Sequence, residues 1–224
     1  GVPTFQGTEG LWARFGKPKM NAYSDFLKNP EEWWDREINH QRSPYVLELR
    51  SAIENSKPNE GHRILQKLED KKLINSIITQ NIDGLHRDKV KEKNIIELHG
   101  SIFKAKCLHC LSEYDTLEYF NNLELGKDCL CSDCLEGFVK VSTISFGQAL
   151  VSETLKKAEK ASINCQFFIV LGSSLKVSPA NNFVRIAKNN GAKIIILNKD
   201  PTPMDGYADI VINECLENIY EQIK

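Results

Sequence analysis

The stretch of sequence that decides the fold is Leu73-Ile74-Asn75-Ser76-Ile77-Ile78-Thr79-Gln80-Asn81-Ile82-Asp83. Residues 73–79 are mostly apolar or β-branched, which predicts a buried strand of a parallel sheet. Polar side chains follow at once in residues 80–83. Parallel sheets bind their ligands beyond the carboxyl ends of the strands, so this change of character predicts a functional loop at a sheet edge.

Two further stretches repeat this arrangement of an apolar strand and a small or polar loop. Residues 166–171 precede Gly172-Ser173-Ser174, and residues 193–197 precede Asn198-Lys199-Asp200. The carboxyl ends of neighbouring parallel strands meet at one edge of a sheet. The loops that follow these strands are therefore expected at the same edge as residues 80–83.

Helical patterns alternate with these strands. Residues 59–68 fit a helix that begins at an Asn59 cap, and residues 179–190 fit a helix that ends before Gly191. Residues 209–212 fit a last strand, which a C-terminal helix follows. This alternation predicts an α/β fold, with a Rossmann-like parallel sheet and helices on both faces.

Length and charge narrow the class of protein. At 224 residues the chain is long enough for one substantial core and a small satellite module. A net charge of −1 argues against nucleic acid or an anionic membrane as the primary partner. No apolar run approaches the roughly 18 residues of a membrane-spanning helix. No signal peptide is visible, so the expected location is cytoplasmic.

Two cysteine pairs, Cys107-x-x-Cys110 and Cys131-x-x-Cys134, predict a metal site. A CxxC turn places two thiolates on one side, and two such turns complete a tetrahedron around Zn²⁺. Four thiolates leave no coordination position for water, so the predicted zinc is structural. The zinc-binding module is expected to span residues 103–143.

Other residues near the cysteine pairs offer alternative ligands. Cys129 could replace Cys131, and His109 lies inside the first pair, but neither keeps the two-residue spacing in both pairs. We interpret both as spectators. Cys165 and Cys215 stand alone in the sequence, which favours positions in the core.

A histidine and a polar loop are the candidate catalytic residues. His99 lies between two short strand patterns, residues 94–98 and 102–106. By itself a histidine in such a turn is more often structural than catalytic. Asn81 and Asp83 likewise have a structural interpretation, as caps of a helix that begins at about Asp83. The order of the motifs along the chain shifts the balance towards catalysis.

That order resembles the order of motifs in the sirtuins, the NAD-dependent protein deacylases. Sirtuins carry a Gln-Asn-x-Asp loop and a His-Gly pair ahead of a four-cysteine zinc module, as found here at residues 80–83 and at His99-Gly100. Further matches are Gly1-Val2-Pro3-Thr4-Phe5, Phe146-Gly147, Gly172-Ser173-Ser174-Leu175-x-Val177-x-Pro179-Ala180 and the loop at Asn198. The resemblance spans essentially the whole chain.

The resemblance implies an NAD-dependent protein lysine deacetylase that yields nicotinamide, O-acetyl-ADP-ribose and free lysine. His99 would act as the general base on a ribose hydroxyl, and Asn81 would join it at the catalytic centre. The residues that the resemblance assigns to NAD binding are Pro3, Phe5, Gln80, Asn81, Ile82, Asp83, Gly172, Ser173, Ser174, Asn198, Lys199, Asp200 and Cys215.

An acylated lysine of a protein or peptide is the partner that the resemblance implies. The peptide would add as a strand between the Phe146-Gly147 segment and the loop after Val177, while Ile144 and Phe146 would line a tunnel for the lysine stem. Glu37 and His40 stand where desuccinylases of the family carry Tyr and Arg. The missing Arg favours an uncharged acyl group.

The sequence also departs from the sirtuin pattern. Residues 1–102 and 144–224 would form the NAD-binding domain, with a cofactor loop and helical insertion at residues 8–45. Sirtuins normally carry a first strand and a Gly-Ala-Gly-x-Ser loop ahead of the Gly-Val-Pro motif, and both are expected to be missing here. Gln6 replaces a usual Arg, and Gln148 a frequent Glu. The alternative functions are NAD hydrolysis or ADP-ribosyl transfer in the same pocket, and a non-catalytic NAD-binding subunit.

Overall fold

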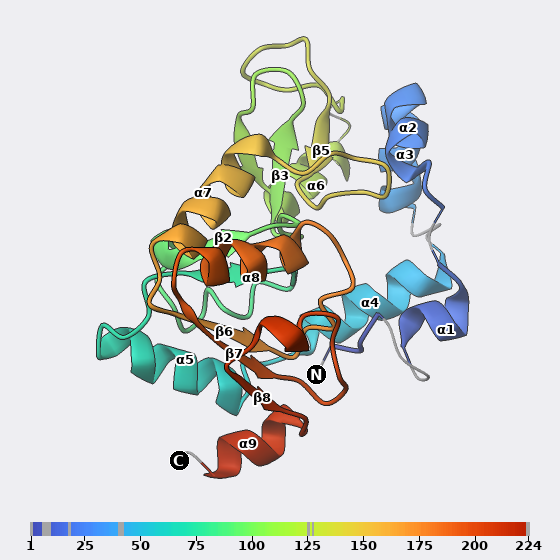
Figure 1. The fold of residues 1–224 in the computed structure, drawn as a ribbon. Helices are drawn as coiled ribbons and strands as arrows, with labels where there is room; N and C mark the ends of the chain where they lie inside the picture. Colours follow the sequence, from blue (N-terminus) through green and yellow to red (C-terminus); the bar gives the residue numbers. More distant parts are fainter. Residues whose placement is uncertain are drawn as a thin grey trace. The chain divides into compact units, whose positions relative to one another are not determined.

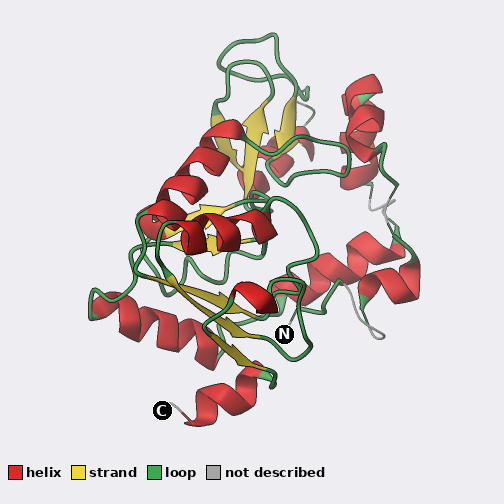
Figure 2. Cartoon of the chain, viewed as in Figure 1, coloured by secondary structure: helices red, strands yellow, loops and turns green. Residues whose placement is uncertain are grey.

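The computed structural model describes residues 2–5, 10–17, 19–39, 43–124, 126 and 128–222. These residues fold into two compact units. Figure 1 labels the helices and strands along the chain, and Figure 2 colours them by type. Unit 1 takes the described parts of Gly1–Lys57, Asn81–Gly84 and His99–Leu150, and unit 2 those of Pro58–Gln80, Leu85–Leu98 and Val151–Lys224. Both predicted catalytic motifs therefore stand where the chain passes from unit 2 into unit 1.

Unit 2 contains the parallel strands that the sequence predicts. Strand β1 (Ile77–Thr79) pairs with β2 (Ile95–Glu97), and a second sheet has the order β6 (Phe167–Leu171), β7 (Lys193–Leu197) and β8 (Ile210–Ile212). Every pairing among these strands is parallel. The predicted α/β class is confirmed. Two 3₁₀ turns complete this part of the chain, η1 (Glu92–Asn94) before β2 and η2 (Asp205–Tyr207) before β8.

The α-helices described in unit 2 are α5 (Glu60–Asp70), α7 (Ser152–Ile163), α8 (Ala180–Asn189) and α9 (Leu216–Gln222). Helices α7 and α8 run side by side, and α8 packs against β7 (Figure 1). The buried side chains at that contact are Val184, Ala187, Ile194 and Ile196. The apolar face of α8 therefore finds its partner in alternate residues of the neighbouring strand.

The predicted start of α5 and the predicted end of α8 are confirmed. Helix α5 begins after Asn59, whose side chain accepts a hydrogen bond from the His62 backbone N–H at 3.3 Å. The His62 ring in turn accepts from the Asn59 N–H, so the two residues form a capping box. Helix α8 ends at Asn189, and Gly191 beyond it adopts the left-handed conformation with φ of 88°.

Two details of the predicted strands are wrong. Only Ile77–Thr79 of residues 73–79 forms a strand, and the Leu73 side chain is 69% exposed. The Leu73 N–H instead bonds to the Leu68 carbonyl and closes the end of α5. In β6, Phe167 and Ile169 are 61% and 51% exposed, because alternate side chains point to opposite faces and α8 covers only one of them.

Unit 1 combines short helices with a small antiparallel sheet. Its helices are α1 (Leu11–Phe15), α2 (Ala22–Lys28), α3 (Pro30–Ile38), α4 (Pro44–Glu54) and α6 (Thr116–Glu124). The sheet has the order β4 (Glu113–Asp115), β3 (Lys104–Cys107) and β5 (Val139–Val141). Trp34 of α3 is buried against this sheet and donates its indole N–H to the Val139 carbonyl at 2.8 Å. None of the helices in the described parts of the chain is long and apolar enough to cross a membrane.

Candidate active site and metal centre

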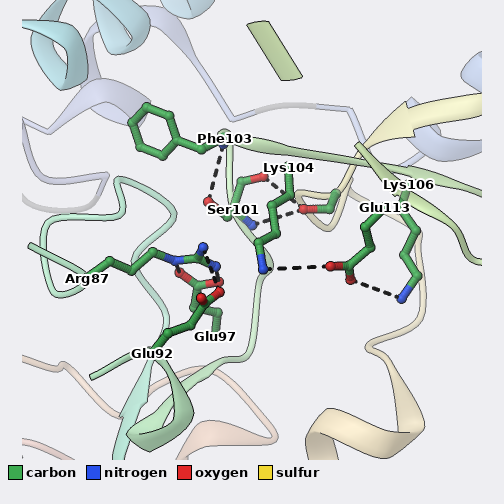
Figure 3. A network of polar contacts seen from close by, with 9 residues as sticks. Arg87, Glu92, Glu97, Ser101, Phe103, Lys104, Lys106 and Glu113 are labelled. Atoms are coloured by element: carbon green, nitrogen blue, oxygen red, sulfur yellow. Dashed lines mark hydrogen bonds and ion pairs between the residues drawn. The ribbon is translucent and has the colours of Figure 1, made fainter. Parts of the chain in front are cut away.

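The backbone around His99 is fixed by a close approach of two chain segments in unit 1. Gly100 has φ of 70°, and a Cβ there would clash with the carbonyl oxygen of Ser142. The Ser142 hydroxyl donates to the carbonyl of Ser101 at 3.0 Å, and the buried Ser101 hydroxyl accepts from the Phe103 N–H (Figure 3). Only glycine fits the position beside His99, which explains the His-Gly pair.

His99 is joined directly to the predicted substrate segment. The Ile144 N–H donates to the His99 carbonyl at 2.9 Å. Two residues further on, the Phe146 ring lies 6.0 Å from that of Trp12, which packs in turn at 5.9 Å on Phe5. A Cβ at Gly147 would clash with the Met20 carbonyl, so a second close approach again requires glycine. Unit 1 thus brings together His99, Ile144 and the aromatic side chains of Phe5, Trp12 and Phe146.

The polar loop that follows β1 belongs to the same unit. The Ile82 carbonyl accepts the Ile102 N–H at 3.2 Å, and Asp83 is buried. Gly84 has φ of 68°, and a Cβ there would lie 2.8 Å from the Phe103 ring. Residues 85–89 form turns, so the interpretation of Asn81 and Asp83 as helix caps is wrong. The loop is held by residues that flank the His99 turn.

In unit 2, the residues predicted to bind the phosphates follow β6, and Gln80, which is predicted to bind a ribose, follows β1. The Gln80 side-chain amide donates to the Ser173 hydroxyl at 3.3 Å, and the Leu175 N–H donates to the same oxygen at 3.3 Å. Gly172 has φ of 59° and donates its N–H to the Leu197 carbonyl. Two strand ends that are distant in the sequence therefore meet at Ser173, as the sequence predicts.

The loop after β7 is tied to the end of β8. The Asn198 N–H donates to the Ile212 carbonyl at 3.1 Å, and the Asn198 side chain donates to the Asp200 carbonyl at 2.6 Å. The Asn213 amide closes the loop by donating to the Asn198 carbonyl. Cys215, which precedes α9, accepts the Asn218 N–H at its carbonyl. These contacts leave the Lys199 and Asp200 side chains exposed.

An ion-pair cluster fixes the segment of unit 2 that leads to the His99 turn. The Arg87 guanidinium binds both carboxylate oxygens of Glu97, with Nε 2.9 Å from Oε1, and also reaches Glu92 at 3.0 Å (Figure 3). Such fork-to-fork pairs are more specific in geometry than a lysine contact. They anchor β2 to the turns that follow residue 84.

The predicted site residues fall into two groups. Unit 1 holds Pro3, Phe5, Asn81, Ile82, Asp83, His99, Ile144, Phe146 and Gly147. Unit 2 holds Gln80, Gly172, Ser173, Ser174, Val177, Asn198, Lys199, Asp200 and Cys215. Gln6 and His40 lie outside the described residues. Ser142 and Trp12 were not predicted, because nothing in the sequence marks a serine or an aromatic residue as the partner of a turn so far along the chain.

The four predicted zinc ligands form one cluster in unit 1. The Sγ atoms of Cys107, Cys110, Cys131 and Cys134 all lie within 4.8 Å of one another. Backbone N–H groups of the turns donate to the sulfurs, for example from Gly137 to Cys134 at 3.4 Å. Four thiolates in this arrangement fit one structural zinc ion, which would link the two turns.

Hydrogen bonds prepare one of these thiols for metal binding. The Tyr114 hydroxyl lies 2.9 Å from the Cys131 sulfur. Burial opposes ionisation, but the hydrogen bonds from Tyr114 and from the backbone outweigh it and lower the pKa of Cys131 to about 6. Cys129 lies outside the cluster, and burial raises its pKa to about 11, while the His109 ring faces Glu136 at 3.3 Å. Neither Cys129 nor His109 belongs to the cluster of four sulfurs, so their interpretation as spectators stays a prediction.

Comparison with known proteins decides the family. Residues 1–179 match the model of the Sir2 family. The chain belongs to the Sir2 family. It is 35% identical over 228 residues to NAD-dependent protein deacylase 2 of Archaeoglobus fulgidus, a match that covers 100% of this chain and 86% of the relative. It is 40% identical over 214 residues to an NAD-dependent protein deacetylase of Shouchella clausii, covering 96% of this chain and 83% of that protein.

Solved structures of the family share this fold. Sir2 in complex with the inhibitor EX-527, 2′-O-acetyl-ADP-ribose and a deacetylated p53 peptide matches with a TM-score of 0.71 and 31% sequence identity. The match covers 95% of this chain and 88% of that structure. The sirtuin resemblance of the motifs therefore extends to the three-dimensional structure.

Proposed function

We propose that this Sir2 chain is an NAD-dependent protein lysine deacetylase, which yields nicotinamide, O-acetyl-ADP-ribose and free lysine. Relatives of 35% and 40% identity are named for NAD-dependent deacylation or deacetylation, and the chain covers most of their length. One observation carries the proposal. His99 is hydrogen-bonded through its carbonyl to Ile144, in the segment that leads to Phe146-Gly147, within the unit that also holds Asp83.

The proposed chemistry gives each residue of unit 1 a task. His99 would remove a proton from a ribose hydroxyl once nicotinamide has left, a task for which an imidazole is the side chain most often used. Asp83, which is buried, would hold the nicotinamide carboxamide, and Asn81 would bind the adjacent ribose. Pro3, Phe5 and Ile82 would complete the contacts of unit 1 with NAD. The acyl oxygen of the lysine substrate would attack the ribose carbon.

The residues of unit 2 would bind the rest of the cofactor. Gly172, Ser173 and Ser174 follow a strand and have small side chains, which lets phosphate and ribose approach the backbone. Gln80 would bind the ribose nearer to nicotinamide. Asn198, Lys199 and Asp200 would contact the adenosine ribose, and the backbone at Cys215 the adenine. Zinc would have a structural task only, because four thiolates fill its coordination sphere.

An acylated peptide would bind through its main chain. Phe146, Gly147 and Val177 would supply partners for an added strand, and Ile144 with Phe146 would enclose the lysine stem. The domain division of the proposal follows the sequence, with residues 1–102 and 144–224 for NAD and 103–143 for zinc. A cytoplasmic location also belongs to the proposal, since cysteine pairs that bind metal are typical of reducing compartments.

The experiment that tests this function is nicotinamide release from NAD, measured with and without an acetyl-lysine peptide. We expect release that requires the peptide and that His99→Ala abolishes. The control variant is His109→Ala, which removes an exposed ring outside the zinc cluster. Release that proceeds equally well without peptide would replace deacetylation by NAD hydrolysis. Absence of turnover in the presence of bound NAD would favour a non-catalytic subunit.

A further inference from the structure

Lys140 is a buried cation at the centre of β5. Its exposed fraction is 3%, and its Nζ donates to the carbonyl oxygens of Val141 at 3.0 Å and Thr143 at 2.6 Å. Burial lowers the pKa of Lys140 to about 8. Both of the acceptors given by the described structure are main-chain carbonyls and not carboxylates. Burying an ammonium group in this way costs free energy, so the contacts that Lys140 makes must offset that cost.

The two carbonyls belong to the turn that leads out of the zinc-binding sheet. Val141 ends β5, and residues 142–143 connect it to Ile144, whose N–H donates to the His99 carbonyl. In the same turn, the Ser142 hydroxyl donates to the Ser101 carbonyl, and the Ser101 N–H points back at that hydroxyl at 3.4 Å. Ser142 of the turn and the adjacent Ile144 therefore contact the His99 loop, while Lys140 binds the carbonyls of Val141 and Thr143.

On its other side, Lys140 is continuous with the metal centre. The Val139 N–H donates to the Cys129 carbonyl, and the Phe138 carbonyl accepts the Leu108 N–H from the first cysteine turn. Gly137, which begins this segment, donates its N–H to Cys134. A short piece of chain thus runs from the predicted metal ligand Cys134 through β5, with Lys140 at its centre, to the turn.

We propose that Lys140 is a positioning residue that fixes the turn at residues 141–143, and through it the acyl-lysine segment at Ile144 and the backbone of His99. Lys140 acts through main-chain carbonyls and does not touch the substrate. The roles of Ile144 in substrate binding and of His99 in catalysis rest on the proposed function. The zinc module in this view supports the substrate site through one buried side chain.

A purely structural lysine would behave differently. Its removal would lower the melting temperature and the amount of active enzyme, and the Michaelis constants of both substrates would stay the same. Loss of a positioning residue raises the KM of the peptide while the KM of NAD is retained, because Lys140 binds the turn that leads to Ile144, whereas the residues proposed for NAD lie in residues 3–5 and in the loops after β1, β6, β7 and β8. The backbone amide of Ile144 supplies a readout that is independent of catalysis.

The test compares Lys140→Met, Lys140→Arg and Lys106→Met. Lys106 lies directly opposite Lys140 in the neighbouring strand β3, but its ammonium is partly exposed and 3.5 Å from Glu113. In zinc-loaded full-length protein we measure both KM values, zinc per chain, and hydrogen exchange at the amides of Ser142 and Ile144. Lys140→Met is expected to raise the peptide KM and the exchange rate of Ile144 about tenfold, as loss of charge-assisted hydrogen bonds implies.

In the same experiment the KM of NAD and the zinc content of Lys140→Met are expected to stay unchanged. We expect Lys140→Arg to keep a peptide KM and an exchange rate close to those of the wild type. Lys106→Met is expected to behave as the wild type does. Equal effects of Lys140→Met and Lys106→Met would overturn the proposal, as would a joint rise of both KM values with loss of zinc. If Lys140→Met does not fold, Lys140→Gln decides the question, because faster exchange confined to Ser142 and Ile144 supports positioning and uniformly faster exchange refutes it. If the wild type shows no deacetylation, the proposed function is rejected. The hydrogen-exchange measurement still tests whether Lys140 positions the turn, because it does not depend on catalysis.

Discussion

The two groups of site residues are held in place by different kinds of contact. In unit 1, the His99 turn is fixed by an irregular crossing, in which Ser101 and Ser142 meet across 41 residues of sequence. In unit 2, Gly172 and Asn198 continue regular parallel strands, and their N–H groups bond to the ends of neighbouring strands. A regular ladder offers many equivalent contacts, whereas the crossing depends on single residues. Unit 1 is therefore expected to be the less tolerant of change.

The largest effect is expected from the metal ligands of unit 1. Cys107→Ser removes one of four clustered sulfurs, and structural zinc can contribute about 10 kcal/mol to the free energy of folding. We expect zinc content to fall from one ion per chain to none, with a large fall in the melting temperature of the protein. Cys129→Ser is the matched control, because Cys129 is buried beside the cluster but is not part of it. Zinc retained at full stoichiometry in Cys107→Ser would contradict this assignment.

The next effect compares glycines of the two units. Gly100→Ala places a methyl group on the Ser142 carbonyl, and we expect a loss of about 3 kcal/mol or more in the free energy of unfolding. Gly191→Ala in unit 2 meets no atom within 4 Å, so only its left-handed conformation is strained, at about 1 kcal/mol. Urea unfolding of both variants checks the difference. Equal losses would show that backbone conformation alone, and not the crossing at Ser142, makes Gly100 necessary.

The same difference explains what could be predicted from the sequence. The loops after β6 and β7 could be placed because an apolar run followed by small or polar residues reports a local pattern. The four zinc ligands could be named because spacing within each turn fixes two sulfurs at once. The partner of Gly100 could not be found, since Ser142 carries no distinguishing chemistry. Lys140 also could not be identified, because a lysine between two valines predicts an exposed side chain.

The failure at residues 73–76 has a related cause. Their composition favours a strand, but the chain must first end α5, and the Leu73 N–H is used for that purpose. A local propensity was overruled by a connection between two elements. The strand boundary predicted from composition was therefore less accurate than the order of the motifs, which located the loop at residues 80–83 correctly.

A pH titration probes the buried cation of unit 1. Its pKa is about 8 in the folded protein and near the ordinary value of 10.5 once unfolded, so between these values the unfolded chain binds a proton that the folded chain does not. The free energy of unfolding should thus rise with pH across this window, by up to about 3 kcal/mol. Cys129 and Tyr119 titrate nearby with raised pKa values, so the readout is the difference between wild type and Lys140→Met. The same pH dependence in both proteins would assign the effect to groups other than Lys140.

The smallest effect on stability is expected in unit 2, at Ser173. Its hydroxyl accepts from Gln80 and Leu175, and Ser173→Ala removes both contacts while the pairing of β6 with β7 remains. We expect a cost of about 1 kcal/mol in unfolding, and a rise of about fivefold in the KM of NAD with the peptide KM unchanged. Ser162→Ala is the control, since that hydroxyl bonds within its own helix α7 to Ala158. If Ser173→Ala raised the peptide KM as strongly as the KM of NAD, the two groups of residues would not be separable in function, although their contacts differ. A rise confined to NAD would show that the regular strand ends of unit 2 serve the cofactor and not the acyl-lysine.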